Sequence, residues 1–206
     1  MIRRCEDHGY FRDTECLECG STGHFILNEE RTERLGKLLT GILRHFPDKF
    51  NLMIDLNGWI DLTHLVRAVS YRYRWVTRSH VLALVYSDEK GRYEIKDSNI
   101  RATYAHSINV DLDYDPNTLP VLFYGTSEEE GGRIVDIGLK PVRQRYVHLS
   151  LSREQADTVA RFRTDNPLIL LVDAERAQDA GIKIMQVNDL ICISDEIPPE
   201  YIELIE

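Results

Sequence analysis

The sequence predicts an α+β protein built from three parts. Three observations lead to this prediction. Cysteine and histidine cluster near the N-terminus, apolar residues recur at helical spacing through the first half, and short apolar runs typical of strands dominate the second half. The expected parts are a small zinc knuckle, a helical unit and a strand-rich mixed α/β unit, over residues 1–28, 29–98 and 99–206. With 206 residues, 43% of them hydrophobic, the chain can bury a core without disulfides.

The N-terminal cluster has the ligand spacing of a small zinc site. Cys5, His8, Cys16 and Cys19 follow the pattern C-x2-H-x7-C-x2-C, and a glycine follows each pair. Two-residue gaps let both ligands of a pair reach one ion, and four nitrogen or sulfur ligands suit a closed tetrahedral zinc. Such a site is structural, because no position is left open for water. His24 is an alternative to His8, and free thiols or disulfides are the alternatives to a metal.

The helical unit is predicted to begin with an amphipathic helix over residues 29–46. Its apolar residues fall at i, i+3, i+4, i+7 and i+8, namely Leu35, Leu38, Leu39, Ile42 and Leu43. Pro47 ends this helix, so Arg44 and His45 are expected in its last turn.

The remaining elements follow from caps, turns and apolar runs. Asp61 or Thr63 is expected to cap a second helix through residue 69, and a third helix begins near residue 77. A strand at 92–95 then completes a unit similar to a winged helix. Further strands are expected at 100–103, 121–124, 146–149, 168–172 and 190–193, with short helices at 128–137, 153–161 and 174–180. Residues 111–118 (DLDYDPNT) form the clearest loop.

The uneven charge restricts the partners of the chain. The formal net charge is −9, of which residues 29–110 carry +3 and residues 111–206 carry −10. An acidic chain binds polyanions poorly, so a nucleic-acid contact should be local and lie in the middle third. The longest apolar run, residues 167–172, is too short for a membrane span, and the N-terminus lacks the apolar stretch of a secretory signal. A cytoplasmic protein with no membrane partner is therefore expected.

Two groups of basic residues in the middle third could carry chemistry. Arg44 and His45 could bind an anion and move a proton, although basic residues also suit the negative end of a helix dipole. Arg101, with His106 and Ser107 following across a turn, could cradle a phosphate. Each group alone is a weak signal.

Two further groups lie in the acidic third. Tyr124, Gly125 and Thr126 end an apolar strand, where glycine lets the backbone approach a ligand closely. Arg143 and Arg145 precede another strand, and they suit either anion recognition or a solvated edge. The sequence contains none of the motifs G-x-x-x-x-G-K-[ST], G-x-S-x-G and H-E-x-x-H, which disfavours P-loop NTPases, serine hydrolases and zinc proteases.

Together, the order and spacing of these motifs resemble the KptA family of RNA 2′-phosphotransferases. The resemblance covers about residues 33–202. The matching motifs are Leu43-Arg44-His45-x-Pro47, Asn57-Gly58-Trp59, Ile100-Arg101-Ala102-x3-His106-Ser107, Leu122-Phe123-Tyr124-Gly125-Thr126-Ser127 and Tyr146-Val147-His148-Leu149-Ser150. The knuckle lies outside this region and resembles an N-terminal extension of archaeal members.

The resemblance implies an NAD-dependent enzyme with a winged-helix lobe that binds RNA and a C-terminal lobe similar to ADP-ribosyltransferases. In the implied reaction, an internal RNA 2′-phosphate attacks C1″ of the nicotinamide ribose of NAD. Transesterification then yields 2′-OH RNA, nicotinamide and ADP-ribose 1″,2″-cyclic phosphate. Spliced tRNA is the expected substrate, and no obligate protein partner is indicated.

The resemblance also implies roles for individual residues. Arg44, His45 and Arg101 would hold the 2′-phosphate. A fourth arginine would be Arg145, or else Arg143, because the position used by the family falls between them. The residues expected to contact NAD are His106, Ser107, Tyr124, Gly125 and Thr126.

The sequence departs from the family at two positions, with Tyr124 in place of histidine and Ala105 in place of glycine. Two other functions are left open, the first of them because of Tyr124. One is a related ADP-ribosyltransferase that modifies another phosphate or a protein. The other is a nucleic-acid-binding protein without catalytic activity.

Overall fold

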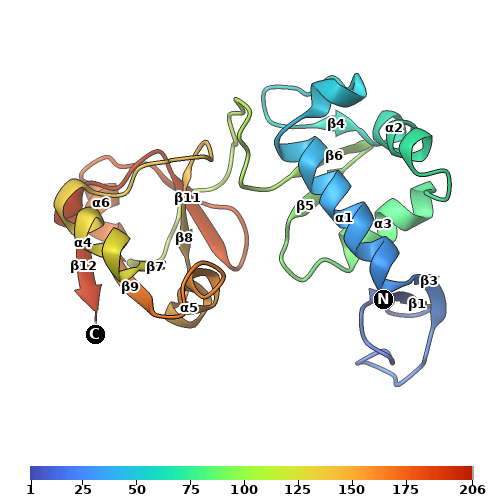
Figure 1. Ribbon diagram of the computed structural model, residues 1–206, viewed down its shortest axis with the longest axis horizontal. Coiled ribbons are helices and arrows are strands. Elements are labelled where there is room, and N and C mark those ends of the chain that lie inside the picture. Colours follow the sequence, from blue (N-terminus) through green and yellow to red (C-terminus); the bar gives the residue numbers. More distant parts are fainter. Residues whose placement is uncertain (206) are drawn as a thin grey trace. The chain divides into compact units, whose positions relative to one another are not determined.

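The computed structural model describes residues 1–205 and contains two compact units (Figure 1). The first unit comprises Met1–Thr103 and Ile108–Leu112, and the second comprises Tyr104–Ser107 and the chain from Asp113 onward. Both combine helices with antiparallel sheets, which confirms the α+β class. The first unit extends past residue 98, where the sequence suggested a boundary, because the strand that follows pairs within it.

Three helices and a small sheet form most of the first unit. Its elements are α1 (Glu29–Arg44), the 3-10 helix η1 (Pro47–Phe50), β4 (Ile60–Asp61), α2 (Leu62–Arg72), α3 (Arg78–Tyr86), β5 (Tyr93–Lys96) and β6 (Asn99–Ala102). Side-chain caps set where helices begin: Asn28 accepts the N–H of Arg31 at 2.8 Å, and Asp61 accepts the N–H of His64 at 2.8 Å. The strands run antiparallel in the order β4-β6-β5.

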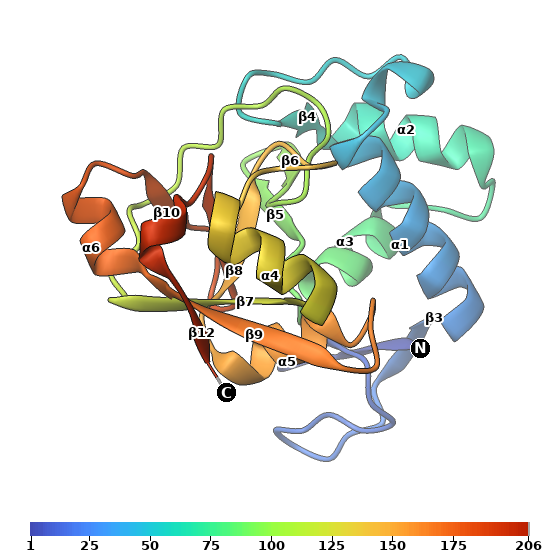
Figure 2. The same ribbon diagram turned by 60° about the vertical axis from the view of Figure 1, so that its left-hand side comes forward.

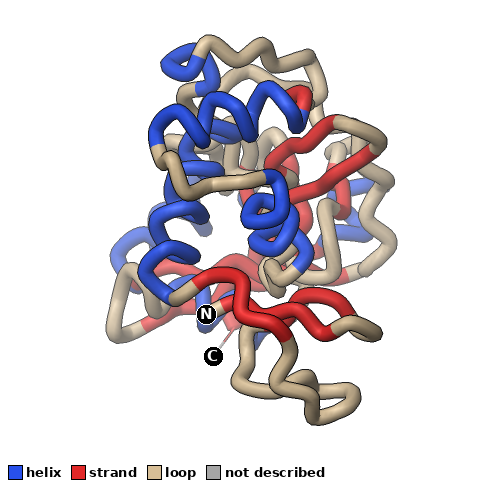
Figure 3. Tube along the Cα trace, turned by 90° about the vertical axis from the view of Figure 1, so that its right-hand side faces the viewer, coloured by secondary structure: helices blue, strands red, loops and turns tan. Residues whose placement is uncertain are grey.

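The N-terminal segment forms a second small sheet that the sequence patterns did not predict. It contains β1 (Ile2–Cys5), β2 (Gly9–Phe11) and β3 (His24–Leu27), in the order β2-β1-β3. Ile2 and Leu27 are fully buried in the same core as α1 and α3. Tyr10 stacks on Tyr86 of α3, with ring centroids 6.4 Å apart. The segment is therefore packed against the helices of the first unit (Figure 3).

A six-stranded antiparallel sheet organises the second unit. Its strands are β7 (Val121–Ser127), β8 (Val147–Ser150), β9 (Pro167–Asp173), β10 (Ile184–Gln186), β11 (Ile191–Ser194) and β12 (Ile202–Ile205), in the order β10-β11-β8-β7-β9-β12. The other elements are α4 (Glu128–Ile137), α5 (Arg153–Ala160), α6 (Ala174–Asp179) and the 3-10 helix η2 (Pro199–Tyr201). β7, β8, β9 and β11 confirm predicted strands, whereas β10 and β12 were not predicted.

Helices α4 and α5 cover opposite faces of this sheet (Figure 2). Gly125 of β7 faces α5, where an added Cβ would lie 2.0 Å from the carbonyl oxygen of Ala156. The next residue, Thr126, points to the other face and donates to Glu130 of α4 at 2.8 Å. The alternation of strand side chains thus packs one helix on each face. Within residues 1–205, every helix is too short or too polar to cross a bilayer.

Candidate functional site

The C-terminal end of α1 presents the first pair of candidate residues. Arg44 is the last residue of the helix and is 8% exposed, and His45 follows as the C-cap. The chain turns here because Phe46 folds back onto Gly41, where a Cβ would lie 2.3 Å from the Phe46 ring. Burial, and then the charge of Arg44, lower the pKa of His45 below its ordinary value. The imidazole is therefore neutral at pH 7 and can accept a proton.

Arg101 is a second buried cation of the same unit, held on β6. Its Nε donates to Oε2 of Glu94 at 2.8 Å, across the pairing of β5 and β6. Its Nη1 donates to the carbonyl oxygen of Asn57 at 3.2 Å, and its guanidinium carbon lies 4.5 Å from the centroid of the Trp59 ring. These contacts fix the plane of a guanidinium that stays charged, which is the form that binds phosphate bidentately.

The segment Tyr104–Ser107 belongs to the second unit and is tied to β8 and the residues before it. The Ala105 N–H donates to Nε2 of His148 at 3.0 Å, and the carbonyl oxygen of His106 accepts the Arg145 N–H at 2.7 Å. The ring of His106 is buried, whereas Ser107 is exposed. Ala105 has a φ of +65°, in the left-handed region that favours glycine. This conformation explains why glycine suits the position in the family pattern.

The two arginines proposed as alternatives for the fourth site differ in their surroundings. Arg145 donates from Nη1 to Asp195 at 2.7 Å, and its guanidinium lies 4.6 Å from the centroid of the Tyr146 ring. The backbone N–H of Arg145 also donates to the carbonyl oxygen of His106. This bond fixes the backbone of Arg145 beside the segment that contains His106 and Ser107, which are expected to contact NAD. Both arginines are exposed, so the contacts of Arg145 and not its burial distinguish it from Arg143.

The candidate residues of β7 are mainly packed into the second unit. Thr126 is 1% exposed and Tyr124 is half-buried, and both lie on the α4 face of the sheet. Position 125 must be glycine because β7 approaches α5 so closely there that a Cβ would clash with it, as described above. The structure therefore gives Gly125 a packing reason that the motif alone did not reveal.

The Cys/His cluster is assembled as the spacing predicted. The ligand atoms of Cys5, His8, Cys16 and Cys19 all lie within 4.8 Å of one another. Cys5 Sγ is 3.7 Å from Cys19 Sγ, and His8 Nδ1 is 3.5 Å from the sulfurs of both Cys5 and Cys16. A tetrahedral zinc with ordinary bond lengths separates two sulfurs by about 3.8 Å and a sulfur from a nitrogen by about 3.6 Å. The cluster therefore has the dimensions of a zinc site.

Local backbone geometry supports this arrangement. Gly9 and Gly20, which follow the two ligand pairs, have φ of +81° and +71° with open space around them, so the backbone conformation alone requires glycine. Backbone N–H groups, first that of His8 and then that of Asp7, lower the pKa of the Cys5 thiol to about 7, which favours the thiolate that binds metals.

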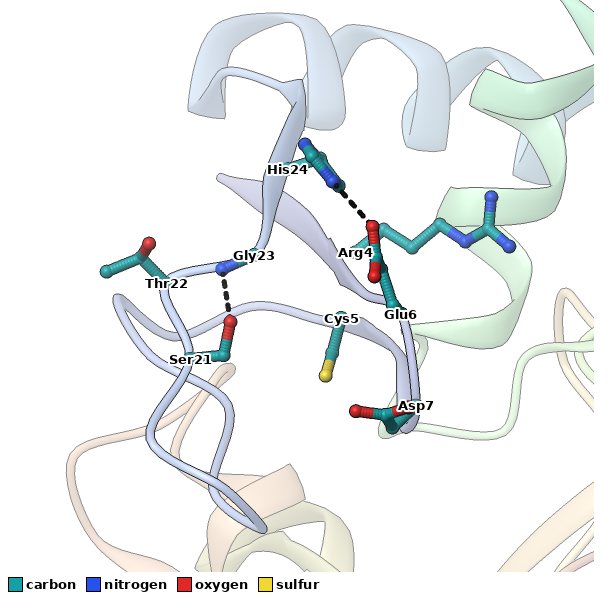
Figure 4. A pocket seen from close by; sticks show the side chains of 8 residues that line it. All are labelled: Arg4, Cys5, Glu6, Asp7, Ser21, Thr22, Gly23 and His24. Carbon is teal, nitrogen blue, oxygen red and sulfur yellow. Dashed lines mark hydrogen bonds and ion pairs between the residues drawn. The ribbon is translucent and has the colours of Figure 1, made fainter.

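The other cysteine and the other nearby histidine are not part of the cluster. His24 Nε2 lies 3.3 Å from Oε1 of Glu6, and Figure 4 shows the Cys5 sulfur pointing away from His24. His8, and not His24, is therefore the histidine of the cluster. Cys192 is fully buried, and burial raises the pKa of its thiol to about 12, as expected for an unreactive core residue.

Comparison with known proteins identifies the family to which this chain belongs. The sequence model of the family described as RNA 2′-phosphotransferase, Tpt1/KptA family, matches residues 30–196. A protein from Archaeoglobus fulgidus named "Probable RNA 2′-phosphotransferase 1" is 52% identical over 203 residues, which cover 98% of this chain and 94% of that protein. A "Probable RNA 2′-phosphotransferase" from Methanosarcina barkeri is 45% identical over the full length of both chains, 206 residues. One from Pyrococcus furiosus is 40% identical over 178 residues, covering 86% of this chain and 97% of its own.

These matches place the protein among the transferases that act on phosphorylated RNA. The chain belongs to the Tpt1/KptA family of RNA 2′-phosphotransferases, which remove the 2′-phosphate of RNA in an NAD-dependent reaction. The resemblance found in the sequence motifs is thereby confirmed.

Some residues that hold the candidate site residues in place were not predicted from the sequence. His148 accepts from the Ala105 backbone, and Asn57 and Trp59 hold the Arg101 guanidinium. All three lie inside motifs that carried the resemblance. Asn57 contributes its carbonyl oxygen, Trp59 the face of its ring and His148 the lone pair of Nε2. The residue types alone do not indicate that these groups contact Arg101 or Ala105.

Proposed function

We propose that this protein removes an internal 2′-phosphate from RNA, with spliced tRNA as its substrate, through an ADP-ribosylated RNA. The observation that carries the proposal is the pair of buried arginines, Arg44 and Arg101, in a chain of this family. Two buried guanidinium groups suit the dense negative charge of a 2′-phosphate next to a 3′,5′-phosphodiester.

The proposed reaction has two steps, in each of which one bond forms and one breaks. First, a 2′-phosphate oxygen forms a bond to C1″ of the nicotinamide ribose of NAD, and nicotinamide leaves. Next, the 2″-hydroxyl of that ribose attacks the phosphorus and loses a proton, and the RNA 2′-oxygen leaves and gains one. The products are 2′-OH RNA and ADP-ribose 1″,2″-cyclic phosphate.

Each candidate residue has a role that fits its surroundings. Arg44 and Arg101 bind the phosphate and stabilise the charge that develops on it. His45, neutral at pH 7, moves the proton of the second step. Arg145, whose backbone holds His106, serves as the fourth arginine, with Arg143 as the alternative.

The residues proposed to contact NAD belong to the second unit. They are His106, Ser107, Tyr124, Gly125 and Thr126. Hydroxyl, imidazole and phenol groups can supply the hydrogen bonds and ring stacking that a dinucleotide requires. The bond between Ala105 and His148 keeps the backbone next to His106 and Ser107 in place.

The order of elements supports the proposed identity of each lobe. In the first unit, α1, β4, α2, α3 and the β5–β6 hairpin follow one another as in a winged helix, with β6 between β4 and β5. We propose this unit as the RNA-binding lobe and the six-stranded second unit as an ADP-ribosyltransferase-like lobe. We further propose that Cys5, His8, Cys16 and Cys19 bind one structural zinc.

Alanine variants test the proposed phosphate site. Arg44→Ala and Arg101→Ala should each lower kcat on a short 2′-phosphorylated RNA by about 10²–10³, the usual effect of removing one group that stabilises transition-state charge. Arg133→Ala removes an exposed arginine of α4 and should leave kcat unchanged. Unchanged kcat in both site variants would refute the assignment.

A further inference from the structure

A basic and aromatic surface lies on the first unit, apart from the proposed phosphate site. Residues 62–87 contain four arginines and no aspartate or glutamate, in a chain with 34 acidic residues among 206. The arginines are densest where the end of α2 leads into the connection to α3, in the segment Tyr71-Arg72-Tyr73-Arg74-Trp75. Arginine alternates there with aromatic residues, a pattern that suits binding to nucleic acid.

Ring contacts join this connection to the N-terminal half of α1. The rings of Tyr73 and Trp75 stack with centroids 5.8 Å apart. Arg34 lies 4.9 Å from the Tyr73 centroid, and Arg31 lies 5.0 Å from the Trp75 centroid. Arg72 also lies over Tyr73, at 5.9 Å. The rings thus gather guanidinium groups from two helices and hold them in fixed directions, which lowers the entropy lost when they bind phosphates.

The surface is accessible and keeps most of its positive charge. Arg31, Arg34, Arg72 and Arg74 are all exposed, and Tyr71 is 80% exposed. Within residues 1–205, the acidic partner identified for these four arginines is Glu30, 3.2 Å from Arg34. We call Arg31, Arg34, Tyr71, Arg72, Tyr73, Arg74 and Trp75 the arginine–aromatic surface.

Helix α1 connects the arginine–aromatic surface to the proposed phosphate site and keeps the two apart. Arg31 and Arg44 lie 13 residues apart on α1, which corresponds to about 20 Å along the helix axis. At ~3.4 Å per nucleotide of a duplex strand, that distance is about six base pairs. A trinucleotide bound at the phosphate site cannot reach this surface, whereas a folded RNA can.

We propose that the arginine–aromatic surface is a second RNA-binding site, which holds the body of a structured RNA while its 2′-phosphate occupies the site at Arg44. Guanidinium groups bind backbone phosphates, and Tyr71 provides an exposed ring for an unpaired base. The inference rests on the proposed function, because it assigns a second contact to the same RNA substrate.

The test compares a short with a long RNA. One substrate is a trinucleotide with a central 2′-phosphate, and the other is a tRNA-length hairpin with the same phosphate. In Arg72→Ala/Arg74→Ala, kcat/KM for the long RNA should fall tenfold or more, and kcat/KM for the trinucleotide should not change. The slope of log(kcat/KM) against log[salt] for the long RNA should become less negative by about 1.5, as expected for two lost phosphate contacts.

A matched variant and a binding assay complete the test. Arg161→Ala/Arg163→Ala removes two exposed arginines at the end of α5 and should leave both substrates unaffected. Fluorescence anisotropy with the hairpin lacking its 2′-phosphate, without NAD, should show tenfold or greater weakening by Arg72→Ala/Arg74→Ala. This binding measurement does not depend on catalysis, so it separates failure of the inference from failure of the proposed function.

Two results would overturn the inference. One is unchanged binding and unchanged kcat/KM for the long RNA in Arg72→Ala/Arg74→Ala. The other is an equal loss of kcat/KM for both RNAs, which would show that the arginines support the fold or the phosphate site and not a separate contact.

Discussion

Loss of the proposed zinc should destabilise the protein by an amount that follows from the spacing of its ligands along the chain. Cys5 and Cys19, 14 positions apart, are the first and last ligands of the cluster, and Cys16 is 5% exposed. A disulfide that closes a loop of this length stabilises a protein by about 3 kcal/mol, and a zinc ion that joins the same residues constrains the unfolded chain in the same way. For a chain of 150–250 residues, 1 kcal/mol corresponds to about 2–4 °C in Tm. Cys16→Ser should therefore lower Tm by about 6–12 °C.

The assay combines metal analysis with thermal unfolding. Purified wild-type protein should contain one equivalent of zinc, and Cys16→Ser should contain much less. A strong chelator should lower the Tm of the wild type but change that of Cys16→Ser little. Cys192→Ala is the control: it removes a buried thiol outside the cluster and should keep the full equivalent of zinc. A Cys16→Ser protein that retained one equivalent of zinc would refute the ligand assignment.

Two further predictions concern packing and protonation. Gly125→Ala should destabilise the protein by about 1–3 kcal/mol, because its Cβ would meet the Ala156 carbonyl oxygen. In denaturant unfolding, the control Gly132→Ala, which enters open space on helix α4, should be neutral or stabilising, and equal effects would contradict the packing argument. The pKa of His45, measured by NMR, should lie below 6.5 and rise in Arg44→Gln. Because the folded-state pKa is lowered, the contribution of His45 to stability should increase as pH rises towards 6.5 and fall on acidification. A His45 pKa above 6.5, or one that Arg44→Gln lowered, would contradict the cause given for the shift.

Helical periodicity and caps made the first unit largely predictable. The spacing of Leu35, Leu39 and Leu43 indicated the buried face of α1, and Pro47 indicated its end, so Arg44 and His45 lie where expected. Asp61, one of two caps considered, is the residue that begins α2. The arrangement of the cluster also followed from spacing, because two-residue gaps restrict where a second ligand can lie.

Pairing between distant segments was not predictable in the same way. The three N-terminal strands are short, and only Ile2 and Leu27 among their residues are deeply buried apolar anchors, so no alternating pattern indicated them. The surroundings of Arg101 also depend on partners over 40 positions earlier in the chain, at Asn57 and Trp59. Such contacts arise from the tertiary fold and leave no local pattern.

The most direct test of the account follows the phosphate itself. An RNA with a single radiolabelled internal 2′-phosphate is incubated with the zinc-containing protein, with and without NAD. The account predicts that the label leaves the RNA only when NAD is present and appears in ADP-ribose 1″,2″-cyclic phosphate, with one nicotinamide released per phosphate. Release of the label as inorganic phosphate without NAD, or nicotinamide release while the label stays on unmodified RNA, would contradict it.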